Sequence, residues 1–314
     1  MNLNLTSKKI TVMPNVLLII VPVVAAAFVL VACSGRKSGK ESSEPAVQET
    51  TVIKFWNGNR SEARKVYERK VLDAIMEATE AEWGPWQIDE NQDEYPGDEE
   101  SLVFTEKGHD LFVTIAGNQK FTKEDKIVIP HLLTKNLLGY RIPIIRQEDA
   151  GLFNQIREAA DLQKLKHGIP LTWSDAEIFR HNGYNVVEDG SFYDIFERLK
   201  TGLFDYSAYG ANEVLGVYEN RASRHEGLII DENILLFYQF PLVFYVNPEL
   251  HLLAERIEDG FQKIIASGEL DAIFNHHYGN IVEQLSLDKR VMFVLDNPLI
   301  PDDFRYIKPD LENL

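Results

Sequence analysis

The sequence contains a single cysteine, Cys33, among its 314 residues. A lone cysteine cannot form an intramolecular disulfide, so the fold must be stabilised by its hydrophobic core. Common catalytic and nucleotide-binding patterns are also missing, because no segment matches a Walker loop, a GxGxxG turn, a GxSxG elbow or an HExxH helix. His276 and His277 are the only adjacent histidines, and neighbouring helix positions point about 100° apart, which disfavours a shared metal ion. We therefore expect no catalytic residue, no metal and no cofactor.

Positive charge is scarce. The chain has 32 lysine and arginine residues against 49 aspartate and glutamate residues, which gives a formal net charge of −17. Such a surface repels nucleic-acid phosphates and anionic lipid head groups, so we expect no nucleic-acid partner. The net charge does not restrict a small ligand, because a few residues in a cleft decide its binding.

The longest apolar run lies near the start of the chain. Lys8 and Lys9 precede 17 uncharged residues, Val16–Ala32, and Cys33 and Ser34 follow directly. This order is typical of a bacterial secretory leader, and the last four residues, Leu30-Val31-Ala32-Cys33, resemble the lipobox of bacterial lipoproteins. The resemblance implies a signal peptide over residues 1–32, cleavage before Cys33 and diacylation of its sulfur.

The lipobox resemblance also implies a location: a periplasmic domain anchored to a membrane through the Cys33 lipid. Ser34 resembles the sorting position that directs lipoproteins to the outer membrane. Two alternatives remain open for the leader. One is an uncleaved transmembrane anchor, although 17 residues interrupted by Pro22 is short for a membrane span. The other is an ordinary leader that happens to end in cysteine.

The composition changes after the leader. Residues 33–50 are mostly polar and lack hydrophobic periodicity, so we expect a flexible tether. The remaining chain, about 265 residues, suits one two-lobed domain or two small ones.

Hydrophobic patterns in this part predict alternating strands and helices. We expect strands near residues 51–56, 86–88 and 111–115, with a helix over 62–80 after the first strand. A helix-like stretch at 150–166 is followed by three short strands near 169–171, 184–187 and 204–208, with helices between them. This alternation predicts a parallel α/β layer. The apolar run 234–246 predicts a core or interlobe strand, and helices are expected at 249–267 and 270–276.

Three predicted strands end in turns that carry polar and aromatic residues. In open α/β sheets, ligands bind at the carboxyl ends of strands, where helix N-termini also favour anions. The turns are at 56–60, 172–175 and 210–213. The candidate ligand-binding residues are Trp56, Asn57, Arg60, Asn118, Thr172, Trp173, Tyr209 and Asn212. For each of them a packing role is the alternative, and for Asp205 we favour a structural cap at the end of its strand.

The middle of the chain resembles a known family. Residues 173–183 fit the pattern W-x-D-x-x-I-x-x-x-N-G, residues 199–205 fit L-x-x-G-x-F-D, and residues 210–213 fit G-x-N-E. These patterns resemble an uncharacterised lipoprotein branch of the bacterial extracellular solute-binding proteins, in the polar-amino-acid class that serves ABC transporters. Residues 250–278 are also similar to the closing helices of that branch.

The resemblance implies a type II periplasmic-binding-protein-like α/β fold, with two lobes joined by two crossing strands. Lobe one would comprise residues 51–139 and 243–314, and lobe two residues 140–242. The implied function is capture of a small polar solute by lobe closure and its delivery to a membrane transporter permease or a sensor, without catalysis. Two other functions stay open: a scaffold lipoprotein that binds no solute, and a periplasmic enzyme on the same fold, similar to dehydratases.

Two departures from the family pattern concern the ligand. In typical amino-acid binders an arginine after a T-x-E turn of lobe one pairs with the ligand carboxylate, but the stretch Thr122–Asp125 has an acid there. Lobe two commonly supplies an aspartate for the ligand ammonium group, and near that place this chain has Tyr209. The missing arginine removes a bidentate, charge-assisted contact. Lys120 and Arg60 are the substitutes that we name for it.

Overall fold

The computed structural model describes residues 49–314. The predicted leader, the lipidation site Cys33 and nearly all of the tether lie outside these residues, so those expectations stay predictions. Within residues 49–314, no helix is both long enough and apolar enough to cross a membrane.

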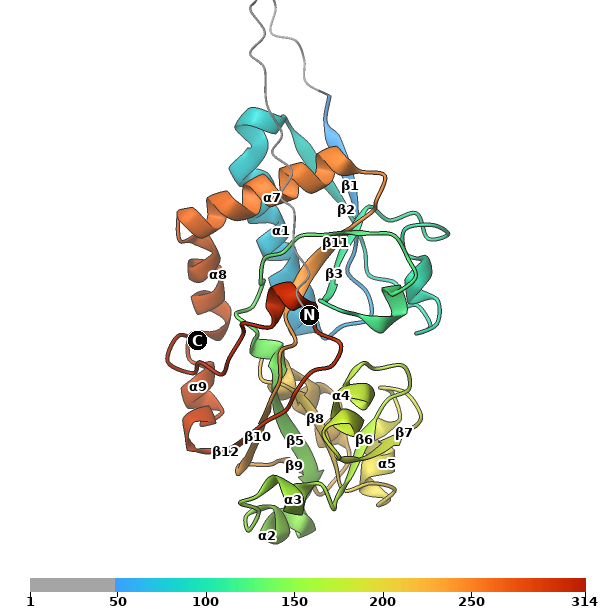
Figure 1. Ribbon diagram of the computed structural model, residues 1–314, viewed down its shortest axis with the longest axis vertical. Helices are drawn as coiled ribbons and strands as arrows, with labels where there is room; N and C mark the ends of the chain where they lie inside the picture. The colour runs from blue at the N-terminus through green and yellow to red at the C-terminus, as the bar shows by residue number, and fades with distance from the viewer. Residues whose placement is uncertain (1–48) are drawn as a thin grey trace, which may run out of the picture. The chain divides into compact units, whose positions relative to one another are not determined.

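The first sheet has five strands, in the order β2-β1-β3-β11-β4. β1 pairs in parallel with β2 and β3, whereas β11 runs antiparallel to β3 and β4. We refer to this sheet and the helices packed on it as lobe one (Figure 1). The strands are β1 (Thr51–Trp56), β2 (Trp86–Asn91), β3 (Leu111–Ile115), β4 (Ile127–Val128) and β11 (Leu242–Val246).

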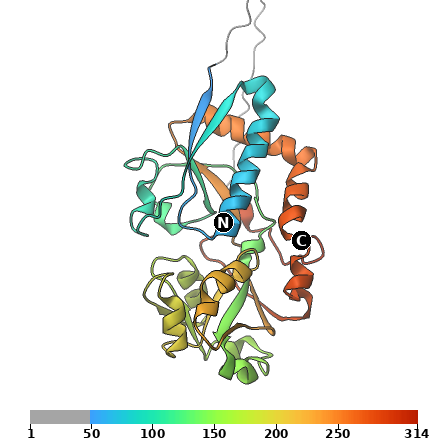
Figure 2. The ribbon, with the colours of Figure 1, turned by 180° about the vertical axis from the view of Figure 1, so that it is seen from behind.

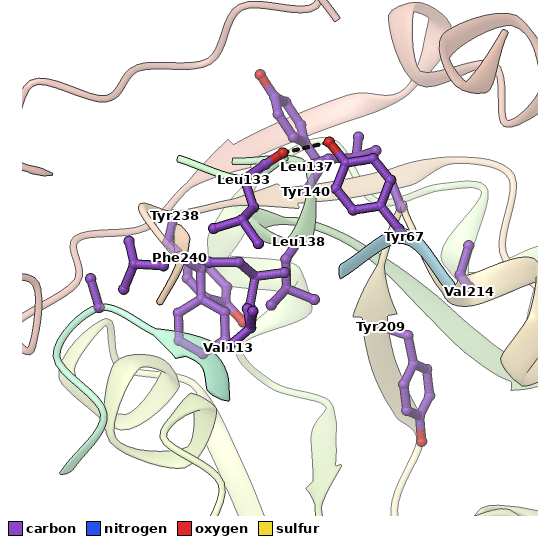
Figure 3. Packing of buried hydrophobic residues seen from close by; sticks show 14 of the residues in the cluster. Tyr67, Val113, Leu133, Leu137, Leu138, Tyr140, Tyr209, Val214, Tyr238 and Phe240 are labelled. Carbon is purple, nitrogen blue, oxygen red and sulfur yellow. Dashed lines mark hydrogen bonds between the residues drawn. The ribbon is translucent and has the colours of Figure 1, made fainter. Parts of the chain in front are cut away.

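Three helices complete lobe one: α1 (Glu62–Trp83), α7 (His251–Ala266) and α8 (Glu269–Tyr278). The first packs against the other two, as Figure 2 shows from behind. Gly260 permits the close approach of α7, because a Cβ there would lie 2.6 Å from the carbonyl oxygen of Ile75 in α1. The hydroxyl of Tyr67 in α1 donates to the carbonyl of Leu133 at 2.5 Å, inside the buried core drawn in Figure 3.

The second sheet, which we call lobe two with its helices, has the order β12-β10-β5-β8-β6-β7, and β9 also pairs with β5. β6 pairs in parallel with β7 and β8, which confirms the predicted parallel layer. The strands are β5 (Tyr140–Arg146), β6 (Lys166–Ile169), β7 (Asn185–Glu188), β8 (Tyr206–Gly210), β9 (Leu228–Ile230), β10 (Ile234–Phe237) and β12 (Val291–Val294). The helices are α4 (Asp175–His181), α5 (Ile195–Lys200) and α6 (Val214–Asn220).

The prediction of a helix over residues 150–166 is wrong. The structure has two single turns, α2 (Ala150–Phe153) and α3 (Ala159–Leu162), and β6 already begins at Lys166. The side-chain amide of Asn233 donates to the carbonyls of Phe153 at 2.8 Å and Ile156 at 3.2 Å. These bonds satisfy carbonyl groups that a continuing helix would have used, so the helix ends there.

Two short segments carry the chain between the sheets, at 137–139 and 238–241. Asn136 joins them, because its amide donates to the carbonyl of Tyr238 at 3.2 Å and its side-chain oxygen accepts from the N–H of Phe240 at 2.6 Å. Gly139 is needed beside this clamp, since a Cβ there would overlap the Tyr238 carbonyl. The apolar run 234–246 therefore forms two strands in different sheets rather than one.

The C-terminal part differs from the expected division of the lobes. We placed residues 243–314 in lobe one, but β12 pairs in parallel with β10 of the second sheet. α9 (Ile281–Gln284) precedes this strand. The segment after β12 lies against the crossing region, where the N–H of Asp310 donates to the hydroxyl of Tyr140 at 2.6 Å. The chain thus passes between the lobes again in addition to the two crossing strands.

Candidate functional site

A cleft of about 780 Å³ lies beside the crossing segments and is lined by both lobes. Lobe one contributes the turn 59–61 with Arg64, the loop 94–98 with Glu100, and residues 114, 115, 118 and 120. Lobe two contributes Arg141, residues 170–175 and 190–193, and the side chains of Tyr209, Glu213 and Arg221. Leu138 and Phe240 lie at the crossing itself.

Five of the predicted ligand-binding residues line this cleft: Arg60, Asn118, Thr172, Trp173 and Tyr209. Arg60, Asn118, Thr172 and Trp173 follow β1, β3 or β6, and Tyr209 lies near the end of β8. The rule that sites form at the carboxyl ends of strands therefore explains why they come together. Asn118 is largely buried, and its amide donates to the Thr114 hydroxyl at 2.9 Å while its oxygen accepts from the N–H of Lys120.

Trp56, Asn57 and Asn212 are not among the residues that line the cleft. Trp56 is 1% exposed, its indole N–H donates to the Asp93 carbonyl at 2.9 Å, and its ring stacks on Tyr95 at 5.1 Å. The amide of Asn57 donates to Glu90 at 2.7 Å, and Asn212 is also buried. The loop that follows β2 covers the first turn and converts its first two residues into packing residues.

Arg60 is held from two sides. It forms an ion pair with Glu68, which is fully buried, and its Nε donates to the Gly58 carbonyl at 2.7 Å. Its guanidinium also lies 5.4 Å from the centre of the Trp56 ring. Burial lowers the pKa of Arg60, and the charge of Glu68 opposes that effect. The residue that we named as a substitute carboxylate ligand is therefore already paired.

Asn59 positions the lobe-one loop that lines the cleft at residues 94–98. Its backbone is in the left-handed region, with φ of 54°. Its side-chain oxygen accepts from the N–H of Tyr95 at 2.8 Å, and its amide donates to the Tyr95 carbonyl and to Glu100, both at 2.7 Å. Glu100 in turn pairs with Lys120 at 2.8 Å. The sequence predicts only a turn at Asn59, although asparagine is favoured at such φ values.

Aromatic rings form the lobe-two wall of the cleft. Trp173 lies 5.7 Å from Phe192 and edge-on to Tyr209 at 6.4 Å. Tyr209 is fully buried behind these rings, its hydroxyl accepts from Ser207 at 3.1 Å, and burial raises its pKa. Its side chain therefore supports the wall rather than presenting a polar group. The guanidinium of Arg221 lies over Phe192, 4.5 Å from the centre of its ring.

A charged network occupies the floor of the cleft. Arg141 is ion-paired with Asp175 and donates from Nε to the Tyr238 hydroxyl at 2.7 Å, and Tyr238 donates to Asp175 at 2.6 Å. Burial lowers the pKa of Arg141, but the neighbouring Asp175, Tyr238 and Glu213 raise it overall. Glu213 also accepts from the hydroxyl of Ser61 at 3.3 Å, which links lobe two to lobe one.

A second contact brings the lobes together at the cleft rim. A Cβ on Gly97 of lobe one would overlap the hydroxyl of Thr172 in lobe two, so the loop backbone lies directly against that side chain. Thr172 has a φ of 69°, and its N–H donates to Glu188 at 3.2 Å. The stretch Thr122–Asp125, where the family pattern has its arginine, does not line the cleft.

No family model and no curated protein matches the chain. Among solved structures, the probable amino-acid ABC-transporter extracellular-binding protein of Bacillus subtilis has a TM-score of 0.53 at 12% identity and covers 74% of this chain and 100% of its own. A Salmonella typhimurium periplasmic binding protein of high arginine specificity has a TM-score of 0.52 at 11% identity, with 73% and 99% covered.

A histidine kinase sensor domain with similarity to periplasmic binding proteins has a TM-score of 0.52 at 13% identity, with 74% of this chain and 97% of its own covered. At such identities the likeness concerns the fold. It confirms the fold that the resemblance predicted: the chain has the two-lobed α/β fold of type II periplasmic binding proteins.

Proposed function

We propose that this protein is an exported solute-binding protein that captures a small polar molecule by closure of its two lobes and delivers it to a membrane transporter or presents it to a sensor. The observation that carries the proposal is the cleft of about 780 Å³, which both lobes line and which lies beside two crossing segments. Its volume falls in the range of small-molecule sites, and closure around such a site is a known mode of solute capture.

The lining suits a polar solute with an apolar part. Five cationic and five acidic residues line the cleft, in contrast to the strongly acidic chain as a whole. The rings of Trp173, Phe192 and Phe240 supply apolar contact area. Histidine, the most common general base, is absent from the described lining, so the serines that line the cleft have no histidine there to activate them. Binding without catalysis is therefore the simpler function.

A thermal-shift screen of the domain 49–314 tests solute binding, with amino acids, small peptides, carboxylates and polyamines as probes. A compound at 100 times its Kd should add about 2.7 kcal/mol of stability, which for a domain of this size is a shift of roughly 5 to 10 °C. Trp173→Ala should abolish the shift, while the control Tyr306→Ala, at an exposed position outside the lining, should retain it. If no compound shifts the wild type, the solute-binding proposal fails and the scaffold alternative gains.

Anchoring is a separate part of the proposal and depends on Cys33. Expression of the full chain in a Gram-negative bacterium, followed by membrane fractionation, should place the wild type in the membrane fraction. Cys33→Ser should release it to the soluble periplasmic fraction if the leader is cleaved by another route, or leave an uncleaved precursor. Membrane attachment of the Cys33→Ser variant with a mature-length chain would contradict lipid anchoring.

A further inference from the structure

The cleft contains five cationic side chains that could meet an anionic group of a ligand: Arg60, Arg64, Lys120, Arg141 and Arg221. A ligand carboxylate binds best to a cation whose N–H groups are not already used. The partners of each cation therefore decide which one is available.

The three lobe-one cations are ion-paired with acids of their own lobe, and one of these carboxylates serves two arginines. Arg60 and Arg64 both pair with Glu68, at 2.7 Å for Arg64, and this carboxylate is fully buried behind them. Lys120 pairs with Glu100 at 2.8 Å. A ligand carboxylate would have to compete with these internal carboxylates for the same N–H groups.

Arg141 is also occupied. Asp175 and Tyr238 take two of its nitrogens, and the third, Nη1, is buried from solvent with Glu213 3.6 Å away. A ligand in the cleft cannot reach this nitrogen without opening the floor of the site. Arg141 therefore holds the crossing region together rather than serving as a first contact.

Arg221 differs from the other four cations. It lines the cleft from lobe two, and its side chain forms no hydrogen bond or ion pair with any residue in the range 49–314. Its guanidinium lies over the rings of Phe192 at 4.5 Å and Tyr193 at 5.0 Å. Because no described residue uses its N–H groups, they are free for a planar, bidentate acceptor.

Two acids of lobe one complement this arginine. Glu94 and Asp98 lie in the loop that Asn59 positions, and both are exposed and line the cleft. Neither forms an ion pair with a lysine, arginine or histidine in the described part of the chain. Unpaired negative charge thus lies on the lobe-one side and unpaired positive charge on the lobe-two side.

We propose that Arg221 binds the carboxylate of the ligand, and that the ligand is a small zwitterion held with its carboxylate toward lobe two and its cationic group toward Glu94 and Asp98 of lobe one. This rests on the proposed solute-binding function and names the class of its substrate. The orientation is opposite to that of typical amino-acid binders, in which an arginine of lobe one takes the carboxylate and an acid of lobe two takes the ammonium group.

Isothermal titration calorimetry on the domain tests the ligand class with pairs of compounds that differ by a carboxylate. The probes are L-lysine, L-arginine and L-histidine, each beside its decarboxylated form: cadaverine, agmatine and histamine. At least one amino acid should bind wild type, and its decarboxylated form should bind at least tenfold more weakly. Equal binding of the two forms would overturn the role of the carboxylate. If none of the six binds, this ligand class is wrong, whereas the broader thermal-shift screen still decides whether the protein binds a solute.

Variants then test the residue and the orientation. Arg221→Gln should weaken binding of the amino acid about 10- to 100-fold, because a hydrogen-bonded charge contact is lost, and Arg221→Lys should lie between this variant and wild type. The matched control is Arg224→Gln, which removes an exposed arginine outside the lining three residues away and should leave Kd within twofold. Unchanged affinity of Arg221→Gln would refute the assignment.

The orientation has its own readout. The double variant Glu94→Gln/Asp98→Asn should weaken binding of the same amino acid about two- to fivefold, as expected for exposed charge contacts. No change in Kd would refute the proposed orientation while leaving the Arg221 assignment in place. Urea midpoints measured for every variant separate loss of binding from loss of folding. If Arg221→Gln does not fold, the Kd of Arg221→Lys tests the assignment instead.

Discussion

His167 should make the stability of this protein depend on pH in a defined window. The residue lies in β6 of lobe two and is 2% exposed. Its ring stacks on Tyr206 at 4.5 Å and meets Phe179 edge-on at 4.1 Å. Burial, with a further contribution from the positive charge of Arg141, lowers its pKa well below the ordinary value of 6.5.

The sign of the effect follows from proton binding. Below pH 6.5 the unfolded chain protonates this histidine, while the folded protein keeps it neutral, so the unfolded state binds more protons. The contribution of His167 to stability is therefore complete above about pH 6.5 and is lost as the pH falls. One proton corresponds to about 1.4 kcal/mol per pH unit, which on integration gives about 2 kcal/mol between pH 7.5 and pH 5.0. This is a large share of a typical unfolding free energy of roughly 5 to 15 kcal/mol.

Urea unfolding of wild type and His167→Gln between pH 7.5 and pH 5.0 measures this contribution. Glutamine keeps an acceptor for the N–H of Ala208, which donates to His167 Nε2 at 3.3 Å, but it does not titrate. The variant loses ring packing at every pH. The diagnostic quantity is therefore how the difference in unfolding free energy between wild type and variant changes with pH. Burial also lowers the pKa of His109, and its effect cancels between the two proteins.

The unfolding free energies of wild type and His167→Gln should converge by about 2 kcal/mol on going from pH 7.5 to pH 5.0. His276→Gln, which removes an exposed histidine on α8, is the matched control for loss of a histidine. Parallel profiles for wild type and His167→Gln would refute the argument, because they would mean that His167 takes up a proton in the folded state as readily as in the unfolded chain.

Two further predictions concern stability. Asp175→Leu should destabilise the protein by about 3 to 5 kcal/mol in urea unfolding, because Arg141 stays buried without its carboxylate partner. The double variant Arg141→Met/Asp175→Leu should be more stable than Asp175→Leu. The opposite order of stability would contradict the pairing. Gly58→Ala should cost about 1 to 3 kcal/mol by thermal unfolding, since its Cβ would overlap the Asp93 carbonyl. Gly151→Ala, where a Cβ meets open space, should cost nothing, and equal effects of the two alanines would argue against the close approach.

The parts of the fold that could be predicted from sequence are those with a local cause. The run Leu111–Ile115 lacks polar alternation and forms a strand between two neighbours, as expected for a strand with both faces covered. Asp205 was predicted as a structural cap at the end of its strand. Its role is structural, since its carboxylate accepts from the N–H of Lys166 at 2.7 Å, but it precedes β8 rather than ending it. The helix expected over 150–166 failed for a non-local reason, since the amide that ends it belongs to Asn233, about 80 residues away in the sequence.

The candidate site divides in the same way. Thr172 and Trp173 reach the cleft because a turn after a parallel strand opens at the sheet edge, which a sequence pattern can indicate. Trp56 follows a strand of the same kind but is covered by the loop that Asn59 binds, and this pairing joins residues 36 positions apart. The sequence alone therefore cannot distinguish a ligand-contacting tryptophan from a packing tryptophan at such a turn. The distinction depends on which distant segment covers the turn.

Arg221 illustrates what local patterns cannot contain. It follows α6 outside every motif that resembles the known family, and nothing in its neighbouring residues marks it. It differs from the other four cleft cations because each of those is ion-paired with Glu68, Glu100 or Asp175, and Glu68 serves two of them. Three of those four ion pairs join different elements of structure. In a chain with an excess of acids, the informative cation is the one that the acids leave unpaired, and this can be read only after all the pairs are in place.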